Sequence, residues 1–191
     1  MKWTKKKIIT ASAIAAAVVI AVVLTLVFTL GGKAEKMAEK YKSSVSSVTS
    51  AVTVTEVKNA DVVAYTKEET ITFTDGDNAE IVTKVTQLSD YKMEFEESET
   101  TASGEIDRSS LVAVDLDVNL FKTKSYRGST FTGKVAAENA AEFFSGGNVS
   151  VDGDIDVKVE FKGNRVSTVT CSYKSASGLT TTMTITYAYG K

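Results

Sequence analysis

The chain of 191 residues contains no histidine, no proline and a single cysteine, Cys171. Histidine is the most common general base and a frequent ligand of soft metals, so its absence excludes Ser–His and Cys–His catalysis within this chain. One cysteine cannot form an internal disulfide, so the fold must be stabilised by packing. We therefore expect a protein that is not an enzyme and has no cofactor.

Charge is unevenly distributed along the chain. Of the 22 basic residues, four lie in the first 32 positions, which contain no acidic residue, so 18 basic residues remain against all 24 acidic ones and give a net charge of −6. An acidic domain of this kind argues against binding to nucleic acid and against docking on anionic lipid.

A long apolar run extends from Ile8 to Leu30 and is interrupted only by Thr and Ser. As a helix, its 23 residues reach roughly 35 Å, which covers a hydrocarbon core of about 30 Å. The apolar region of a cleaved signal peptide is shorter, about 7–15 residues, and ends at a small-x-small site. The length therefore favours a retained anchor over a cleaved signal peptide.

The flanking charges predict the orientation of this anchor. Four lysines precede the run, whereas the lysines after it are accompanied by glutamates. The positive-inside bias then makes residues 1–7 a cytoplasmic basic tail, 8–30 a single transmembrane helix, 31–50 a juxtamembrane helix or Ser-rich linker, and 51–191 one extracytoplasmic domain at the cell membrane.

Two interpretations are open for the segment after the anchor. The run from Ser43 to Ser50 is rich in serine, which is typical of a stalk. In the alternative, an apolar stripe at helical spacing docks on the domain. The stripe consists of Met37, Tyr41, Val45 and Val48.

From Ala51 onward, apolar and polar residues alternate with a period of two, which predicts an antiparallel sheet of about 7–8 strands with one solvated face. Turn residues at 75–78 and at Gly163-Asn164 predict hairpins. The clearest strand is expected at 110–121, with Leu116 inward and Asp115 and Asp117 outward, and the polar stretch 99–110 is expected to be a loop.

The Ala-rich stretch at 134–145 breaks this alternation and predicts the one helix of the domain. Glu138 and Glu142 are four residues apart, and Gly146-Gly147 is suited to a helix C-terminus. We expect Phe143 and Phe144 on its buried side. The predicted fold class is α+β, mostly β, with a curved antiparallel sheet packed on this helix.

Two polar patterns are weak candidates for sites. Asp152, Asp154 and Asp156 alternate as in the first half of a calcium loop, but the second half of that motif is missing, so a polar turn is the favoured interpretation. Threonines on the outer side of residues 168–186 resemble hydroxyl arrays that bind sugars or ice. Threonine is also an ordinary exposed strand residue, and that interpretation is favoured.

The layout as a whole, over residues 45–190, resembles that of the half-barrel lipid and lipoprotein carriers of bacterial envelopes, although no motif supports the resemblance. The leading hypothesis is a non-enzymatic binding module of the cell envelope, whose partner is another envelope protein or a cell-wall component. The alternative is a carrier or sensor of an apolar ligand. Its cavity would be lined by Met93, Phe95, Leu116, Phe161, Met183 and Tyr187.

Overall fold

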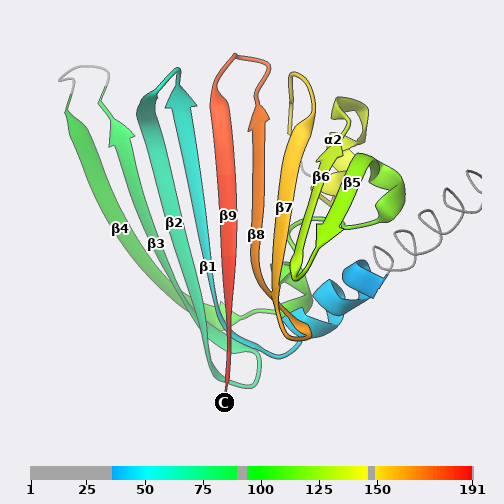
Figure 1. Cartoon of the computed structure of the whole chain (residues 1–191). Coiled ribbons are helices and arrows are strands. Elements are labelled where there is room, and N and C mark those ends of the chain that lie inside the picture. The colour runs from blue at the N-terminus through cyan, green and yellow to red at the C-terminus, as the bar shows by residue number, and fades with distance from the viewer. Residues whose placement is uncertain (1–35, 90–93, 146–148, 191) are drawn as a thin grey trace, which may run out of the picture.

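A computed structural model describes residues 36–89, 94–145 and 149–190, and its main feature is a nine-stranded antiparallel sheet (Figure 1). The prediction of a mostly-β antiparallel fold is confirmed, with nine strands in place of the expected 7–8. The expected anchor at 8–30, the basic tail at 1–7 and Met93 lie outside the described residues. Within the described ranges, no helix is both long and apolar enough to cross a membrane.

The chain builds the sheet from its centre to one edge, then from the other edge back to the centre. The spatial order is β4-β3-β2-β1-β9-β8-β7-β6-β5, and residues 106–120 connect the two edges. The strands are β1 (Val48–Asn59), β2 (Val62–Asp75), β3 (Asn78–Leu88), β4 (Phe95–Glu105), β5 (Phe121–Arg127), β6 (Thr130–Val135), β7 (Ile155–Lys162), β8 (Arg165–Lys174) and β9 (Thr180–Tyr189).

Short helical turns interrupt the two long connections. The connection between the edges contains η1 (Arg108–Leu111) and η2 (Val118–Leu120). The connection from β6 to β7 contains η3 (Ala137–Asn139) and α2 (Ala140–Phe143). The predicted hairpins are confirmed, because Gly76 and Gly163 adopt positive φ angles of 57° and 65° where β2 turns into β3 and β7 into β8.

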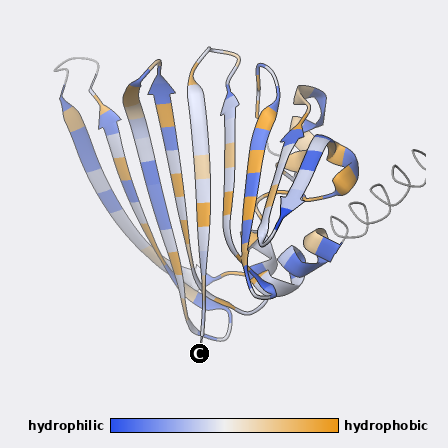
Figure 2. Ribbon diagram, viewed as in Figure 1, coloured by the Kyte–Doolittle hydropathy of each residue, from blue (hydrophilic) through white to orange (hydrophobic). Residues whose placement is uncertain are grey.

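The sheet has an inner face, which packs against the N-terminal helix (residues 36–45) and the 106–120 connection, and an outer face in solvent. Apolar and polar residues alternate along strands such as β7, as Figure 2 shows by colour. The β7–β9 half of the inner face is deeply buried. The β2–β4 half is only partly covered and extends beyond the core.

The predicted apolar stripe runs from the N-terminal helix into the first residue of β1 and packs on the inner face of the sheet. Met37, Tyr41, Val45 and Val48 are each 1% exposed or less and belong to the same core cluster as the strands. The hydroxyl of Ser44 also accepts a hydrogen bond from the backbone N–H of Val166 at the start of β8. Residues 36–48 are thus an integral part of this core. The Ser-rich segment within them is not a free stalk.

The strand expected at 110–121 is wrong. Asp115 and Asp117 accept hydrogen bonds from the backbone N–H groups two residues later, at Asp117 and Asn119, and this local bonding replaces a strand ladder. The prediction that alternate residues here point into the core is nevertheless correct for Val114 and Leu116, which are fully buried.

The loop expected at 99–110 is also wrong over its first half, because residues up to Glu105 belong to β4. This strand pairs with β3 along its whole length without a bulge. Its side chains are exposed on both faces, so the apolar alternation by which the other strands were predicted is missing. An edge strand that covers no core does not need that alternation.

The helix expected at 134–145 is reduced to η3 and the four-residue α2. Residues 133–135 instead pair with β7, from Val157 to Ile155. Alanine favours a helix only by fractions of a kcal/mol per residue, which strand pairing readily outweighs. The expected burial of Phe143 is confirmed, and Phe144 packs against it with ring centroids 4.9 Å apart.

Candidate ligand-binding trough

A depression of about 570 Å³ lies on the inner face where the partly covered half of the sheet meets the core. We call it the trough. Its apolar floor follows from strand register, since Ala51 of β1 is paired with Ile71 of β2, and Ile71 with Ile81 of β3. On the other side of β1, Thr53 is paired with Ile185 of β9. Four neighbouring strands therefore present small and β-branched side chains to the same opening.

The connection that leaves β4 forms the wall of the trough. Six residues at the end of β4 and in this connection line the opening: Glu105, Ile106, Asp107, Ser110, Leu111 and Ala113. Asp107 caps η1 by accepting the backbone N–H of Ser109 at 2.8 Å, which holds the turn in place.

Three carboxylates line the trough, and the two exposed ones lie at its rim. Glu105 and Asp107 belong to the wall, and Glu69 of β2 belongs to the floor. Lys67 forms an ion pair with Glu69 at 2.8 Å. The hydrogen bonds from Ser109 to its carboxylate lower the pKa of Asp107, so this side chain stays ionised at neutral pH. An apolar floor with an anionic rim suits a ligand that combines apolar groups with positive charge.

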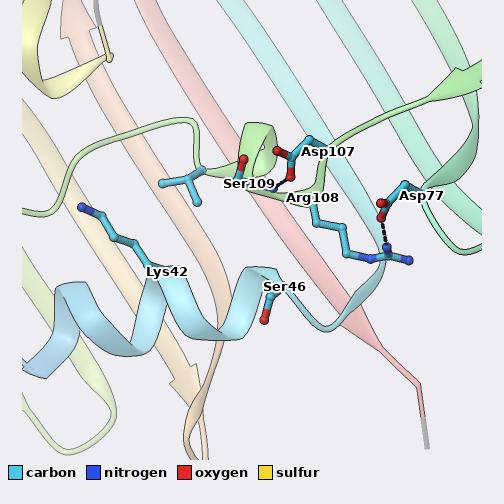
Figure 3. A pocket seen from close by; sticks show the side chains of 7 residues that line it. Lys42, Ser46, Asp77, Asp107, Arg108 and Ser109 are labelled. Carbon is cyan, nitrogen blue, oxygen red and sulfur yellow. Dashed lines mark hydrogen bonds and ion pairs between the residues drawn. The ribbon is translucent and has the colours of Figure 1, made fainter.

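A second depression, of about 520 Å³, lies on the other side of the same wall (Figure 3). Arg108 lines this depression and makes three contacts there. Its guanidinium forms an ion pair with Asp77 at 2.5 Å, donates to the carbonyl of Val48 at 3.2 Å and stacks 4.0 Å from the ring centroid of Phe73. Because Arg108 is occupied by these contacts, we interpret this depression as the fastening of the wall to β1 and β2, not as a binding site.

The residues predicted to line an apolar cavity do not come together in one opening. Leu116, Phe161 and Tyr187 are packed in the core with at most 6% exposure. Phe95 is 53% exposed at the start of β4, and Met183 is half-buried on β9. None of the described members of that set lines either depression.

Two of the three weak calcium candidates form ion pairs with lysines. Asp154 forms an ion pair with Lys122 at 2.9 Å, and Asp156 one with Lys134 at 2.7 Å. Asp152 is exposed in the turn before β7. The described part of the chain contains no cluster of three or more acidic or cysteine side chains arranged to hold a metal ion.

The hydroxyl rows of the outer face are confirmed on β8 and β9 but stop there. Thr168, Thr170 and Ser172 are paired with Thr186, Thr184 and Thr182. On β1, the next strand, the residues paired with these threonines have no hydroxyl group: they are Val52, Val54 and Glu56. A two-strand array supports the interpretation of these threonines as ordinary exposed strand residues.

Sequence reasoning missed the residues that form the trough. The wall was missed because the polar composition of residues 99–110 predicts a loop and the alternation at 110–121 predicts a strand, and neither pattern indicates a path along the inner face. A signal for the floor was present in β2, where Tyr65, Lys67, Glu69 and Ile71 alternate and so share one face.

Comparison with protein-family models and with curated proteins finds no match. Among solved structures, the chain is similar to the dehydratase domain from the CurK module of curacin polyketide synthase, at 9% identity and a TM-score of 0.23, with 74% of this chain and 75% of that chain covered. Two inactive mutants of that dehydratase are similar at 9% and 8% identity, with TM-scores of 0.24 and 0.22 and the same coverage. A similarity of this size transfers neither fold nor activity to this chain.

Proposed function

We propose that this chain is a single-pass membrane protein whose extracytoplasmic domain is a non-enzymatic binding module of the cell envelope, and that the trough is its binding site. The anchor is supported by the 23-residue apolar run and the lysines before it. The observation that carries the binding role is the trough itself, an opening of about 570 Å³ with an apolar floor and an acidic rim.

The chemistry of the trough favours a polypeptide segment with apolar and basic side chains, presented by another envelope protein. Such a segment places apolar groups on Ile71, Ile81 and Ile185 and cations near Glu105 and Asp107. An apolar carrier function receives less support, because Phe131, Phe143 and Leu116 fill the centre of the domain with at most 1% exposure.

The anchor is tested on intact cells and membranes. The full chain is expected to stay in the membrane pellet after alkaline carbonate washing, and protease added outside is expected to remove the domain. Recovery of a soluble domain that lacks the first thirty-odd residues would instead identify a cleaved signal peptide.

The trough is tested with two labelled peptides on the full chain in zwitterionic nanodiscs, with empty nanodiscs as the blank. An alternating Lys–Leu peptide is expected to bind and an alternating Glu–Leu peptide is not. Glu69→Gln is expected to weaken binding, because it removes an anion and leaves the Lys67 cation unpaired. Ile71→Lys is expected to abolish binding by placing a cation in the floor.

Neighbouring residues supply matched controls, because adjacent residues of a strand face opposite sides of the sheet. Glu68→Gln likewise removes a carboxylate and Thr72→Lys likewise adds a cation, but both lie on the outer face and are expected to leave binding unchanged. Equal effects of the inner-face and outer-face variants would refute a site in the trough.

A further inference from the structure

The two edge strands of the sheet carry charge of opposite sign. β4 contains Glu96, Glu97, Glu99 and Glu105 and no basic residue. β5, at the other edge, contains Lys122, Lys124 and Arg127 and no acidic residue. Among the described residues, each of these two strands pairs with one neighbour only, so its other edge carries backbone donors and acceptors outside the sheet ladder.

The β4 edge is open to pairing along its length. All eleven of its residues are exposed, its ladder to β3 is regular, and Phe95 adds an exposed apolar side chain at its start. The chain also has no proline, which is a common guard on edge strands. Charge is therefore the main feature that decides what can add to this edge.

Some of this charge is already neutralised within the chain. Lys84 lies 3.5 Å from Glu99, and Lys122 lies 2.9 Å from Asp154. The remaining charges match by face. Strand register places Glu97 and Arg127 on the outer face, and Glu96 and Lys124 on the inner face. Each face of one edge thus has an oppositely charged counterpart on the same face of the other edge.

We propose that β4 of one copy of this chain pairs with β5 of a second copy. Pairing of two β4 edges, or of two β5 edges, sets like charges side by side, whereas β4 with β5 sets unlike charges side by side. In a sheet of nine antiparallel strands the first and last run in the same direction, so copies of the same orientation form this contact as a parallel pair.

The test uses full-length chains in membranes and two single-cysteine variants that carry different tags. Phe95→Cys marks the outer face of β4 next to Glu97, and Ser125→Cys marks the outer face of β5 next to Arg127 on that face. Native Cys171 is fully buried, so a short bismaleimide leaves it unreacted. A cross-linked dimer is expected when the two variants are mixed and not when either is present alone, and its yield is expected to fall as salt increases.

Charge reversal then separates specific pairing from crowding in the membrane. Glu96→Lys with Glu97→Lys is expected to abolish the mixed cross-link, as is Lys124→Glu with Arg127→Glu. All four changes in both tagged chains are expected to restore it, because the edges are again of opposite sign. Thermal denaturation of each variant verifies that the domain remains folded. Cross-linking of either single variant alone at equal yield, absence of the mixed product, or failure of the fourfold variant to restore it would overturn the proposal.

Discussion

The hydroxyl groups of Tyr41 and Tyr187 lie 2.8 Å apart in the core, where they join the N-terminal helix to β9. The Tyr187 hydroxyl donates to the carbonyl of Leu111 at 2.9 Å, which ties the wall of the trough to the same point. The single hydroxyl hydrogen of Tyr187 is used in the hydrogen bond to the Leu111 carbonyl. In the hydrogen bond between the two tyrosines, Tyr41 is therefore the donor and Tyr187 the acceptor. Three segments that are distant in sequence thus meet in one buried hydrogen-bonded chain.

This chain of hydrogen bonds predicts unequal costs for removing the two hydroxyls. Tyr187→Phe leaves both the Leu111 carbonyl and the Tyr41 hydroxyl without a partner, and it is expected to lower the free energy of unfolding by about 2–3 kcal/mol. Tyr41→Phe removes the donor to Tyr187 and weaker backbone hydrogen bonds with Ala113 and Val114, and it is expected to cost less, about 1–1.5 kcal/mol. Urea denaturation of both variants measures the difference, and equal costs would contradict the assigned direction of donation.

The same burial predicts a loss of stability in alkali. Burial raises the pKa of Tyr41 from 10.0 to about 12 and that of Cys171 from 9.0 to about 12, and it also raises the pKa of Tyr187. The folded state holds these protons more tightly than the unfolded state. Their stabilising contribution is therefore complete below the unfolded pKa values and is lost as pH rises toward the folded ones.

Between its two pKa values, each such group is expected to cost about 1.4 kcal/mol of stability per pH unit. Denaturation midpoints measured across that alkaline range are expected to fall steeply for the native chain and less steeply for Tyr41→Phe. A midpoint that is independent of pH over the interval in which Tyr41 and Cys171 titrate would contradict their burial as protonated groups.

Sequence periodicity predicted the structure well where a strand has one buried face. It failed where neither face of a strand is buried, and where side chains form hydrogen bonds with the nearby backbone. In β7, β8 and β9, alternation and turn residues together specify strand, face and hairpin. In β4 both faces are solvated, so nothing alternates. Around Asp115 and Asp117 the alternation is present, but their carboxylates satisfy backbone N–H groups locally and no strand forms.

The candidate site was less predictable than the fold because it joins elements far apart in sequence. Its floor needs the register of Ala51, Ile71 and Ile81 across three strands, and its wall needs the path of the connection after Glu105. Neither is encoded in a local pattern. The described members of the predicted apolar set do not line one opening, because an apolar pattern does not distinguish residues such as Leu116 and Phe161, which fill the core, from residues that line a cavity.

Two adjacent residues of the 106–120 connection test the prediction that Leu116 points into the core and Asp117 points outward. Leu116 is fully buried, so Leu116→Asp places an unpaired charge in the core and is expected to cost at least about 3 kcal/mol, a large part of a stability of about 5–15 kcal/mol. Asp117→Ser keeps an oxygen that can accept the N–H of Asn119 and is expected to change stability little. Equal free energies of unfolding for the two variants would contradict the placement of Leu116 in the core and Asp117 outside it.

Phe143 decides between a filled core and a carrier cavity. It is fully buried and contacts Phe121 and Phe144 edge-on, with centroids at 6.1 and 4.9 Å. In a filled core, Phe143→Ala leaves a cavity and is expected to cost about 3–5 kcal/mol, whereas the exposed neighbour change Glu142→Ala is expected to cost little. Native mass spectrometry of the purified domain without the proposed anchor (residues 36–191) is then expected to show no stoichiometric lipid. A bound lipid together with an unchanged stability of Phe143→Ala would favour the carrier, because a residue that only lines a ligand cavity loses few packing contacts when it is truncated.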